Sequence, residues 1–363
     1  MKDKMNVTPI IMAGGQGTRF WPASRTAMPK QYLSMFDDGQ SLLANTVKRV
    51  SPLVVNSSDI MVVTSASQVD LVKEHAPSVR IVAEPQARNT AATNALAAVY
   101  TQHYNPDSVI VCLPSDHYIS NEAQFISAIN CAVQLACEKD LLVTLGATPN
   151  SPHTGYGYIK TGEQIGADKL FVERFVEKPD LETAKSYLRD GGYLWNMGIF
   201  IWRPQIFLDA LKQSLPAMHA SMLELQAAIG SPDEERVAAR VFEGLEAISV
   251  DYGVMEKADN VAVVPGGDLG WNDVGSWDSW AQQLDTQNGV NQEQNSLQGE
   301  VVALNSRRNI VSARSGRFIA LLDCDDMVVI DTDDALLVCS RGKTQNVRQI
   351  VDELKAQKRM DLL

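Results

Sequence analysis

The chain has 363 residues with 44 acidic and 32 basic side chains, so its formal net charge is −12. This balance argues against a dedicated nucleic acid binder, and contents of 45% hydrophobic and 21% charged residues exclude disorder, collagen and coiled coil as whole-chain descriptions. No stretch approaches the roughly 18 apolar residues that span a bilayer, and none follows the N-terminus as a leader. We expect a cytoplasmic, two-domain protein without a membrane or nucleic acid partner, whose five cysteines are reduced core thiols.

Residues 5–36 contain no acidic side chain, yet they carry Arg19, Arg25 and Lys30. In a chain with a large excess of acid, such a stretch is a candidate anion site. The alternative is a chance gap around a buried strand. The apolar run over residues 8–13 does predict a buried strand, so the residues that follow the run decide between the two readings.

Gly14, Gly15 and Gly17 come directly after the predicted strand. Glycine lets the backbone turn sharply and bring its N–H groups against a phosphate without interference from a Cβ atom. The spacing fits neither common phosphate loop, because Arg19 stands where a P-loop has its second glycine and Phe20 where the dinucleotide fingerprint has its third. The segment therefore indicates a site of another kind for a nucleoside triphosphate or similar polyanion.

Strands and helices alternate through the next part of the chain. Short apolar runs predict strands at 60–63, 79–82, 109–113 and 141–145, with helices between them at 66–74, 90–104 and 121–138. This alternation predicts an α/β fold with a mostly parallel sheet covered by helices. Ligands of such sheets bind beyond the carboxyl ends of the strands, where Gly14 and Ser115–Asp116–His117 would both lie.

The pattern changes in the last quarter of the chain. After a helix-rich stretch near 204–243, residues 282–288 and 291–295 are polar and predict a linker or surface loop. Apolar bursts then recur every eight or nine residues, which predicts a small all-β module. The bursts lie at 301–304, 310–311, 318–322, 327–330 and 336–338. We expect one domain over residues 1–285 and a second over 286–363.

Eight segments in register resemble the signatures of the sugar-1-phosphate nucleotidylyltransferases, and most closely those of the bacterial mannose-1-phosphate guanylyltransferases. Each segment alone is a weak signal, but together they cover most of residues 8–280. They are residues 9–25 with 29–31, then 84–90, 113–117, 155–159, 175–180, 195–200, 249–256 and 270–277. The resemblance implies a Rossmann-like mixed, mostly parallel sheet flanked by helices, with a short left-handed β-helix-like module at the C-terminus.

The family's reaction is attack by a sugar-1-phosphate oxygen on the α-phosphorus of a nucleoside triphosphate, with loss of pyrophosphate. It needs positioning and charge neutralisation more than proton transfer, because the attacking phosphate is already mostly anionic at neutral pH. By resemblance, Arg19 and Lys30 contact the triphosphate, and Lys178 grips the sugar phosphate; these three are the expected catalytic residues. The expected nucleotide-binding residues are Gly14, Gly15, Gly17, Thr18, Arg19, Lys30, Asn89, Ser115 and Asp116.

The resemblance also implies a sugar site and a metal site. Gly157, Glu177, Lys178, Asn196 and, as a weaker candidate, Asp251 are expected to bind the sugar phosphate. Asp116 and Asp273 are expected to hold one Mg²⁺, an ion that commonly takes only one or two carboxylates from a protein.

The leading expectation is synthesis of GDP-mannose from GTP and α-D-mannose 1-phosphate. The alternatives are the same transfer with another pair, such as a manno-heptose or glucose 1-phosphate and another nucleotide, or a non-catalytic sensor of nucleotide sugars. The β-helix-like module is usually a dimerisation element in this family, so we expect a homodimer. Some longer relatives continue into an isomerase domain; the chain stops before one, and isomerase activity is not expected.

Overall fold

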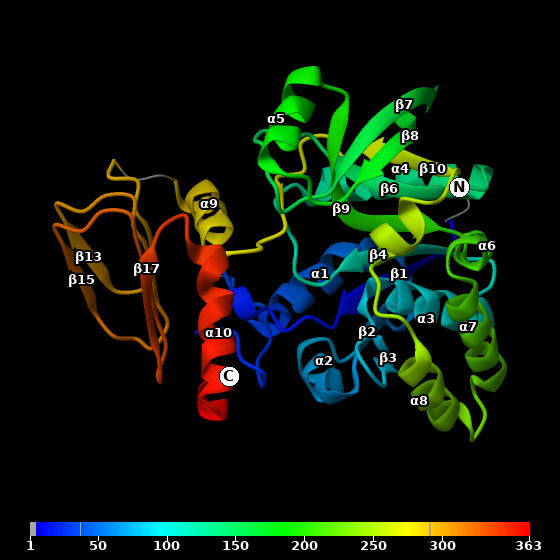
Figure 1. Ribbon diagram of the computed structural model, residues 1–363, viewed down its shortest axis with the longest axis horizontal. Coiled ribbons are helices and arrows are strands. Elements are labelled where there is room, and N and C mark those ends of the chain that lie inside the picture. Colours follow the sequence, from blue (N-terminus) through cyan, green and yellow to red (C-terminus); the bar gives the residue numbers. More distant parts are fainter. Residues whose placement is uncertain (1–4, 37, 290–291) are drawn as a thin grey trace. The chain divides into compact units, whose positions relative to one another are not determined.

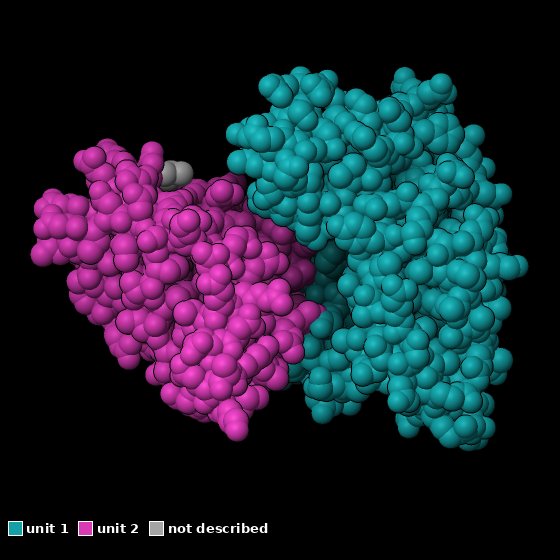
Figure 2. All heavy atoms as spheres, in the orientation of Figure 1, with its two compact units in different colours: residues 1–14, 46–115, 119–271 teal, residues 15–45, 116–118, 272–363 magenta. Residues whose placement is uncertain are grey.

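The computed structural model describes residues 5–36, 38–289 and 292–363 (Figure 1). The described chain divides into two compact units, which Figure 2 distinguishes by colour. Unit 1 contains residues up to 14 together with 46–115 and 119–271, and unit 2 contains residues 15–45, 116–118 and 272–363. Each unit is therefore built from separate stretches of the sequence.

Unit 1 is built around a sheet of nine strands, in the order β3-β2-β1-β4-β9-β6-β10-β8-β7 over the described residues. Strands β1 to β4 are mutually parallel, as are β6 and β10, whereas β9, β8 and β7 pair antiparallel with their neighbours. The bounds are β1 Val7–Ala13, β2 Met61–Ser65, β3 Arg80–Glu84, β4 Val109–Pro114, β6 Leu142–Ala147, β7 Tyr158–Gly166, β8 Lys169–Val176, β9 Tyr193–Trp202 and β10 Val261–Pro265. The predicted mixed, mostly parallel sheet is confirmed.

The helices of unit 1 cover this sheet (Figure 1). Most residues of α3 between 91 and 101 are buried, because its many alanines pack closely on every side. Side chains cap two other helices: Asn121 accepts a hydrogen bond from the Gln124 N–H, and Asp180 accepts one from Thr183. The bounds are α2 Val69–His75, α3 Asn89–Tyr104, α4 Glu122–Glu138, α5 Leu181–Asp190, α6 Pro204–Ser214, α7 Pro216–Ala228 and α8 Glu234–Gly244. Helix α1 spans Leu42–Val50, and the short strands β5 and β11 span Tyr118–Ile119 and Trp271–Asn272.

The C-terminal strands of unit 2 form two small groups, β12-β14-β16-β17 and β13-β15, in agreement with the predicted β module. Val301 lies beside Ile319 and Ile310 beside Val328, which are 18 residues apart, whereas Ser296 lies beside Ile310, which is 14 residues on. The buried Asn309 donates its Nδ2 hydrogens to Asn295 Oδ1 and the Cys324 carbonyl, and its Oδ1 accepts from the Met327 N–H. The bounds are β12 Ser296–Gln298, β13 Val301–Leu304, β14 Ile310–Ala313, β15 Ile319–Leu322, β16 Met327–Asp331 and β17 Leu336–Ser340.

The predicted loop at 282–288 is wrong, because these residues belong to α9, Trp277–Asn288. Ser276 caps the helix by accepting a hydrogen bond from the Ser279 N–H. The buried Trp277, Trp280 and Leu284 recur at helical spacing, and the glutamines occupy positions between them. Read alone, the polar residues hid an amphipathic helix. In the second predicted loop segment, 291–295, residue 291 lies outside the described part of the chain, and residues 292–295 contain neither helix nor strand.

Unit 2 joins the glycine-rich segment to the C-terminal module. Trp21 donates its indole N–H to the Leu362 carbonyl at 2.8 Å, and Arg314 donates to the Ser34 carbonyl at 2.7 Å. Helix α10, Val347–Ala356, contributes Val347 and Val351 to the same apolar core as Phe20 and Trp21. The expected domain boundary at 285/286 stays a prediction, since packing groups residues from both sides of it.

The expectations about membrane-spanning segments and about the cysteines have different outcomes. None of the helices over the described residues is both long and apolar enough to cross a bilayer. The five cysteines are free thiols, as expected, but only Cys112 is buried, while Cys137 is exposed and the other three are partly exposed. Their description as core thiols is therefore wrong except at Cys112.

Candidate active site

The glycine-rich loop begins where β1 ends and carries the chain from unit 1 into unit 2 between Gly14 and Gly15. Gly17 has φ +63°, and a Cβ atom at this position would collide with the Lys30 side chain. The Gly17 carbonyl accepts a hydrogen bond from Ser24 Oγ at 2.6 Å, and the Gly15 carbonyl accepts one from Gln31 Nε2 at 3.0 Å. The loop is therefore fixed against the segment that carries Lys30.

Lys30, Asp116 and Asp273 meet at one point of unit 2. The Lys30 side chain is buried, and its Nζ donates to Asp116 Oδ2 at 2.8 Å and to the Asp273 carbonyl at 3.0 Å. Burial alone would raise the pKa of the Asp116 carboxyl, but the Lys30 ammonium and His117 outweigh that effect and hold the pKa below its usual value. An ionised carboxylate and an ammonium are thus held ready for charged ligands.

The backbone beside Asp273 is strained. Val274 has φ +45° and is fully buried, and a positive φ is unfavourable for a β-branched residue. The Val274 N–H donates to Asn272 Oδ1 at 2.7 Å, and the Gly275 N–H donates to Asp273 Oδ1 at 2.9 Å. The first hydrogen bond holds the turn at Val274, and the second holds the Asp273 carboxylate. Sequence reasoning missed Val274 because a valine in this setting carries no signal for a left-handed turn.

Two of the three basic residues in the acid-free stretch have carboxylate partners from distant parts of the chain. Arg25 forms an ion pair with Asp334 at 2.7 Å, and Lys30 forms the pair with Asp116. Arg19 is exposed and donates to Gln345 Oε1 at 3.0 Å; no described carboxylate forms an ion pair with it. The acid-free stretch therefore presents one uncompensated cation, Arg19, at its surface.

The five residues expected at the sugar phosphate come together within unit 1. Asn196, on β9, donates its Nδ2 hydrogen to Asp251 Oδ1 at 2.8 Å and its backbone N–H to the Gly157 carbonyl at 2.8 Å. Lys178 Nζ contacts Glu177 Oε1 at 2.5 Å. A Cβ atom on Gly157 would collide with the Glu177 carboxylate and lie 3.3 Å from the Asn196 Cβ atom. The missing Cβ atom thus lets the Glu177 carboxylate lie against the backbone beside Asn196.

The charges around this group are strongly coupled. Burial, and then the nearby Glu177 carboxylate, raise the pKa of Asp251 to about 6. Burial would lower the pKa of Lys178, but the hydrogen bond and the charge of Glu177 raise it overall. Lys178 also has φ +48°, a strained conformation for a residue other than glycine. Such strain is characteristic of residues held in place for a ligand, and Lys178 stays protonated at neutral pH.

The remaining expected nucleotide residues lie near the carboxyl ends of strands in unit 1. Ser115 follows β4, where its N–H donates to the Met12 carbonyl and its own carbonyl accepts from Thr46 Oγ1, both at 3.0 Å. Asn89 is exposed with φ +64°, and its Oδ1 accepts from the Thr90 N–H at 2.8 Å. Thr18 and Arg19, by contrast, belong to unit 2. The expected nucleotide-binding set is thus divided between the two units.

Glu84, at the end of β3, is a candidate that the residue-level predictions did not name. Its side chain is buried, and its Oε1 accepts a hydrogen bond from Thr93 Oγ1 at 2.6 Å. The other carboxylate oxygen, Oε2, lies 3.9 Å from the position of a Cβ atom on Gly14. Burial raises the pKa of Glu84 to about 7, despite the opposing Thr93 hydrogen bond. In the sequence, the available signal for this residue was a single glutamate at the end of an apolar strand.

Two family models match the chain. A model described as Nucleotidyl transferase matches residues 8–288, and one described as MannoseP isomerase/GMP-like beta-helix domain matches residues 299–354. The second match agrees with the parallel coils of β12 to β16.

Similar proteins are known from several bacteria. "Mannose-1-phosphate guanylyltransferase" of Salmonella muenchen is 39% identical over 97% of this chain and 74% of its own length. "Xanthan biosynthesis protein XanB" of Xanthomonas campestris pv. campestris is 38% identical over the same shares. The crystal structure described as mannose-1-phosphate geranyltransferase from Thermus thermophilus has a TM-score of 0.86 at 33% identity and covers 97% of this chain and 100% of its own. The chain therefore belongs to the nucleotidyl transferase family and, within it, to the group of proteins named mannose-1-phosphate guanylyltransferase.

Proposed function

We propose that this sugar-phosphate nucleotidyltransferase transfers GMP from GTP to α-D-mannose 1-phosphate, giving GDP-mannose and pyrophosphate. The observation that carries the proposal is the presence of two groups of charged and polar side chains in one family member. One group contains Lys30, Asp116 and Asp273, and the other contains Lys178, Glu177 and Asn196. A non-catalytic sensor would not require both groups to be intact.

The residues around Lys30 suit the leaving side of the reaction. Attack on the α-phosphorus expels pyrophosphate, so negative charge accumulates on the departing oxygens. The Lys30 ammonium and the exposed Arg19 guanidinium would neutralise that charge, and the amides around Gly15 and Gly17 would hold the phosphates. No general base is required, because the second pKa of a phosphate monoester lies near 6.

We propose Mg²⁺ as the cofactor, held by Asp116 and Asp273. The donor set fits this ion, because both side chains offer hard oxygen ligands. Both residues also contact the Lys30 ammonium, Asp116 through its carboxylate and Asp273 through its backbone carbonyl. No group of three or more potential metal ligands occurs among the described residues, which is consistent with an ion that takes its other ligands from phosphate and water. When bound, the metal would polarise the phosphate oxygens. Lys30, now paired with Asp116, would then be free to contact the triphosphate.

The group around Lys178 suits the attacking side. Its ammonium would hold the sugar phosphate as a point charge. Asn196, Glu177 and Asp251 would form hydrogen bonds with the sugar hydroxyls. Discrimination between sugars that differ in one hydroxyl depends on such polar groups, because a mismatched sugar leaves a buried group unpaired. Gly157 has no Cβ atom, so the Glu177 carboxylate can lie against the backbone beside Asn196, where both side chains could contact one sugar.

Glu84 favours guanine over a pyrimidine base. Guanine presents two adjacent N–H donors on its pairing edge, and a carboxylate accepts both, whereas uracil and thymine present an N–H beside a carbonyl. Glu84 Oε2 has no described hydrogen-bond donor and faces Gly14 at the start of the phosphate loop. We expect Glu84→Gln, whose amide offers one donor and one acceptor, to lower kcat/KM for GTP by roughly 10- to 100-fold and to improve the relative use of UTP.

The deciding experiment is pyrophosphate release over a matrix of nucleoside triphosphates and sugar 1-phosphates. GTP with mannose 1-phosphate should give the highest kcat/KM. Turnover with UTP but not GTP would show that the proposed nucleotide substrate is wrong. Preference for a heptose or glucose 1-phosphate would show that the proposed sugar substrate is wrong. Binding of GDP-mannose without turnover of any pair would support the sensor alternative and overturn the proposal.

We also propose that the chain forms a homodimer through its C-terminal module. The outward side chains of β13 and β15 are apolar and exposed, and the strand register places Leu304 beside Leu322. Val302 and Phe318 are exposed as well. Contiguous apolar surface of this kind is characteristic of a protein interface.

A further inference from the structure

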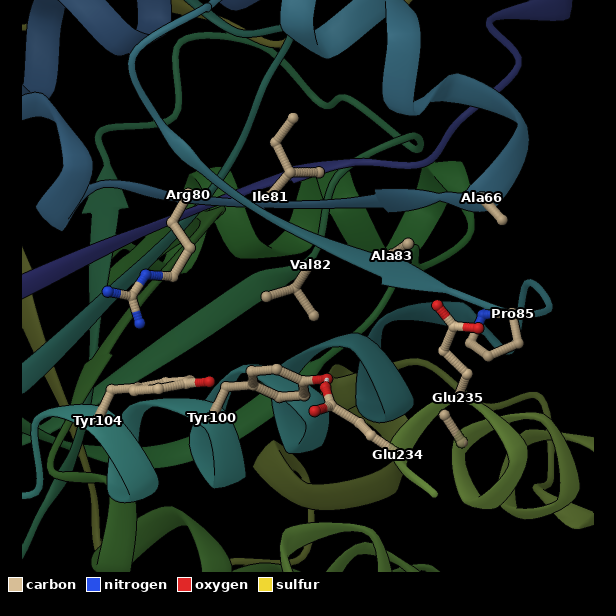
Figure 3. Close-up of a pocket in the computed structure, with 11 residues that line it drawn as sticks. Ala66, Arg80, Ile81, Val82, Ala83, Pro85, Tyr100, Tyr104, Glu234 and Glu235 are labelled. Carbon is tan, nitrogen blue, oxygen red and sulfur yellow. Dashed lines mark hydrogen bonds between the residues drawn. The ribbon is translucent and has the colours of Figure 1, made fainter. Parts of the chain in front are cut away.

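A cavity of about 680 Å³ lies in unit 1, bounded by β3, α3 and α8 (Figure 3). Its volume is in the range of ligand sites, and none of the residues expected to bind the substrates lines it. Its lining combines apolar side chains with polar and charged ones, namely Arg80, Tyr100, Tyr104, Glu234 and Glu235. The lining residues that matter here are Arg80, Ile81, Ala83, Tyr104 and Glu235.

One wall of the cavity is an unpaired strand edge. Strand β3 ends the sheet, and among the described residues it pairs with β2 alone. The Arg80 N–H donates to the Ile60 carbonyl at 2.9 Å, so Arg80 and every second residue after it face β2. In a parallel strand the intervening residues point their N–H and C=O groups the other way. Ile81 and Ala83 therefore turn four backbone hydrogen-bonding groups away from the sheet, and both residues line the cavity.

The cavity carries opposite charges at its two ends (Figure 3). At one end the exposed Arg80 guanidinium lies 4.5 Å from the centre of the Tyr104 ring, and at the other end stands the exposed Glu235. No ion pair involves either side chain among the described residues. Glu234, in contrast, is already engaged by the Tyr100 hydroxyl and the Gly230 N–H. The two available charges thus lie at either end of the strand edge.

We propose that this cavity binds an extended peptide segment of a partner protein, which adds to the free edge of β3 as a further strand. Strand addition uses main-chain hydrogen bonds for affinity and side-chain pockets for specificity. The partner segment would carry an acidic side chain at the Arg80 end and a basic one at the Glu235 end. At about 3.3 Å per residue, the stretch from Arg80 to Pro85 separates these two charges by roughly three to five residues. Small or apolar side chains between them would meet Val82 and the tyrosines.

The first test uses two capped, fluorescein-labelled peptides, Asp-Val-Thr-Val-Lys and its reverse, Lys-Val-Thr-Val-Asp, titrated into the full chain by anisotropy. One order should bind with a Kd below about 1 mM and the other at least tenfold more weakly. Methylation of the peptide backbone nitrogens should weaken the better peptide at least tenfold. Hydrogen exchange should show slower exchange of the Ile81 and Ala83 amides in the complex.

A matched pair of variants tests the protein side. Ala83→Pro removes the edge N–H without breaking a bond to β2, since proline is tolerated on edge strands, and Ala83→Ser keeps the N–H. Ala83→Pro should reduce binding of the better peptide at least tenfold, Ala83→Ser should not, and both should keep the wild-type Tm within a few degrees. Arg80→Gln and Glu235→Gln should each weaken binding.

Several outcomes would overturn the proposal. Failure of both peptides to bind below 1 mM, or equal binding of the methylated peptide, would exclude strand addition. If the edge were instead occupied by a second copy of the chain, Ala83→Pro would lower the oligomer mass without any peptide present. If Arg80→Gln bound each of the two peptides as tightly as the wild type does, the charged ends of the cavity would not select the ligand.

Discussion

Asp251 is the residue of the sugar group whose pKa is raised into the physiological range. Its pKa of about 6 reflects burial and the Glu177 carboxylate. Asp251→Asn keeps an oxygen that can accept from Asn196, but it removes the charge and replaces the other acceptor oxygen by an NH₂ donor. A lost charged hydrogen bond to a sugar hydroxyl should lower kcat/KM for mannose 1-phosphate by roughly 10- to 100-fold, with the KM for GTP unchanged.

The stability of the same variant should move in the opposite direction. Because the folded pKa of Asp251 is raised, its stabilising contribution is fully present below about pH 3.8 and is lost as pH rises through about 6. At pH 8 the wild type therefore holds an unfavourable buried charge, which Asp251→Asn removes. Thermal unfolding at pH 8 should show a Tm equal to or above that of the wild type. A lowered Tm together with equal losses for both substrates would indicate a structural role instead.

Glu84 makes a second pH dependence testable at the residue scale. Its folded pKa is about 7 against an ordinary 4.5, so the free energy of unfolding of the substrate-free protein should fall as pH rises from about 4.5 through 7. The contribution is at most about 3 kcal/mol. Urea unfolding between pH 5 and 8 should show this slope, and Glu84→Gln should flatten it. An unchanged slope in the variant would assign the dependence to other groups.

At the scale of elements, the glycine-rich loop offers a matched pair of substitutions. Gly17 has φ +63° and a Cβ would meet Lys30, whereas Gly15 has no atom within 4 Å of a Cβ and no positive φ. Gly17→Ala should cost about 2–4 kcal/mol, from left-handed strain and the collision. Gly15→Ala should change stability by less than about 1 kcal/mol. Denaturant unfolding compares them, and equal losses would mean that the loop is not held against Lys30.

The same scale explains what the sequence could predict. Strands such as β1 and β4 are continuous apolar runs, and their length and flanking residues identify them without tertiary information. Helix α9 is not predicted from composition, because polar residues separate its buried tryptophans. Only the helical spacing of the apolar residues indicates the helix. The left-handed Val274 could not be predicted, because the hydrogen bonds that hold it depend on the folded loop around Asn272 and Asp273.

For the candidate site, residue types were predictable but their pairing was not. The family signatures named Lys30, Asp116 and Asp273. However, the contacts of the Lys30 ammonium with Asp116 and Asp273 join residues that are 86 and 243 positions apart in the sequence. Glu84 was named only within a segment, because burial gives it its shifted pKa and burial is a property of the fold. Residue identity is local, whereas charge state and position depend on tertiary structure.

At the scale of the whole molecule, charge is arranged differently from its order along the sequence. The acid-free stretch predicts a positive surface, but Asp334 and Asp116 compensate Arg25 and Lys30. A net charge of −12 would otherwise oppose the approach of two anionic substrates. Asp116 is the ion-pair partner of Lys30, so we infer that a divalent cation bound at Asp116 would compete with Lys30 for this carboxylate and leave the ammonium available to the triphosphate.

The proposed homodimer is the remaining property of the whole molecule that can be tested. Leu304 and Leu322 are 58% and 63% exposed and lie beside each other on β13 and β15. Changing both to Glu places two charges on the apolar face, and a dimer that buries them would dissociate because unpaired buried charges are costly. Light scattering should give twice the chain mass of 39.8 kDa for the wild type and the single mass for the double variant. Val55→Glu is the matched control, since Val55 is an apolar residue of unit 1 that is 81% exposed, and it should remain dimeric. A monomeric wild type, or a double variant that keeps the dimer mass, would rule out this face as the interface.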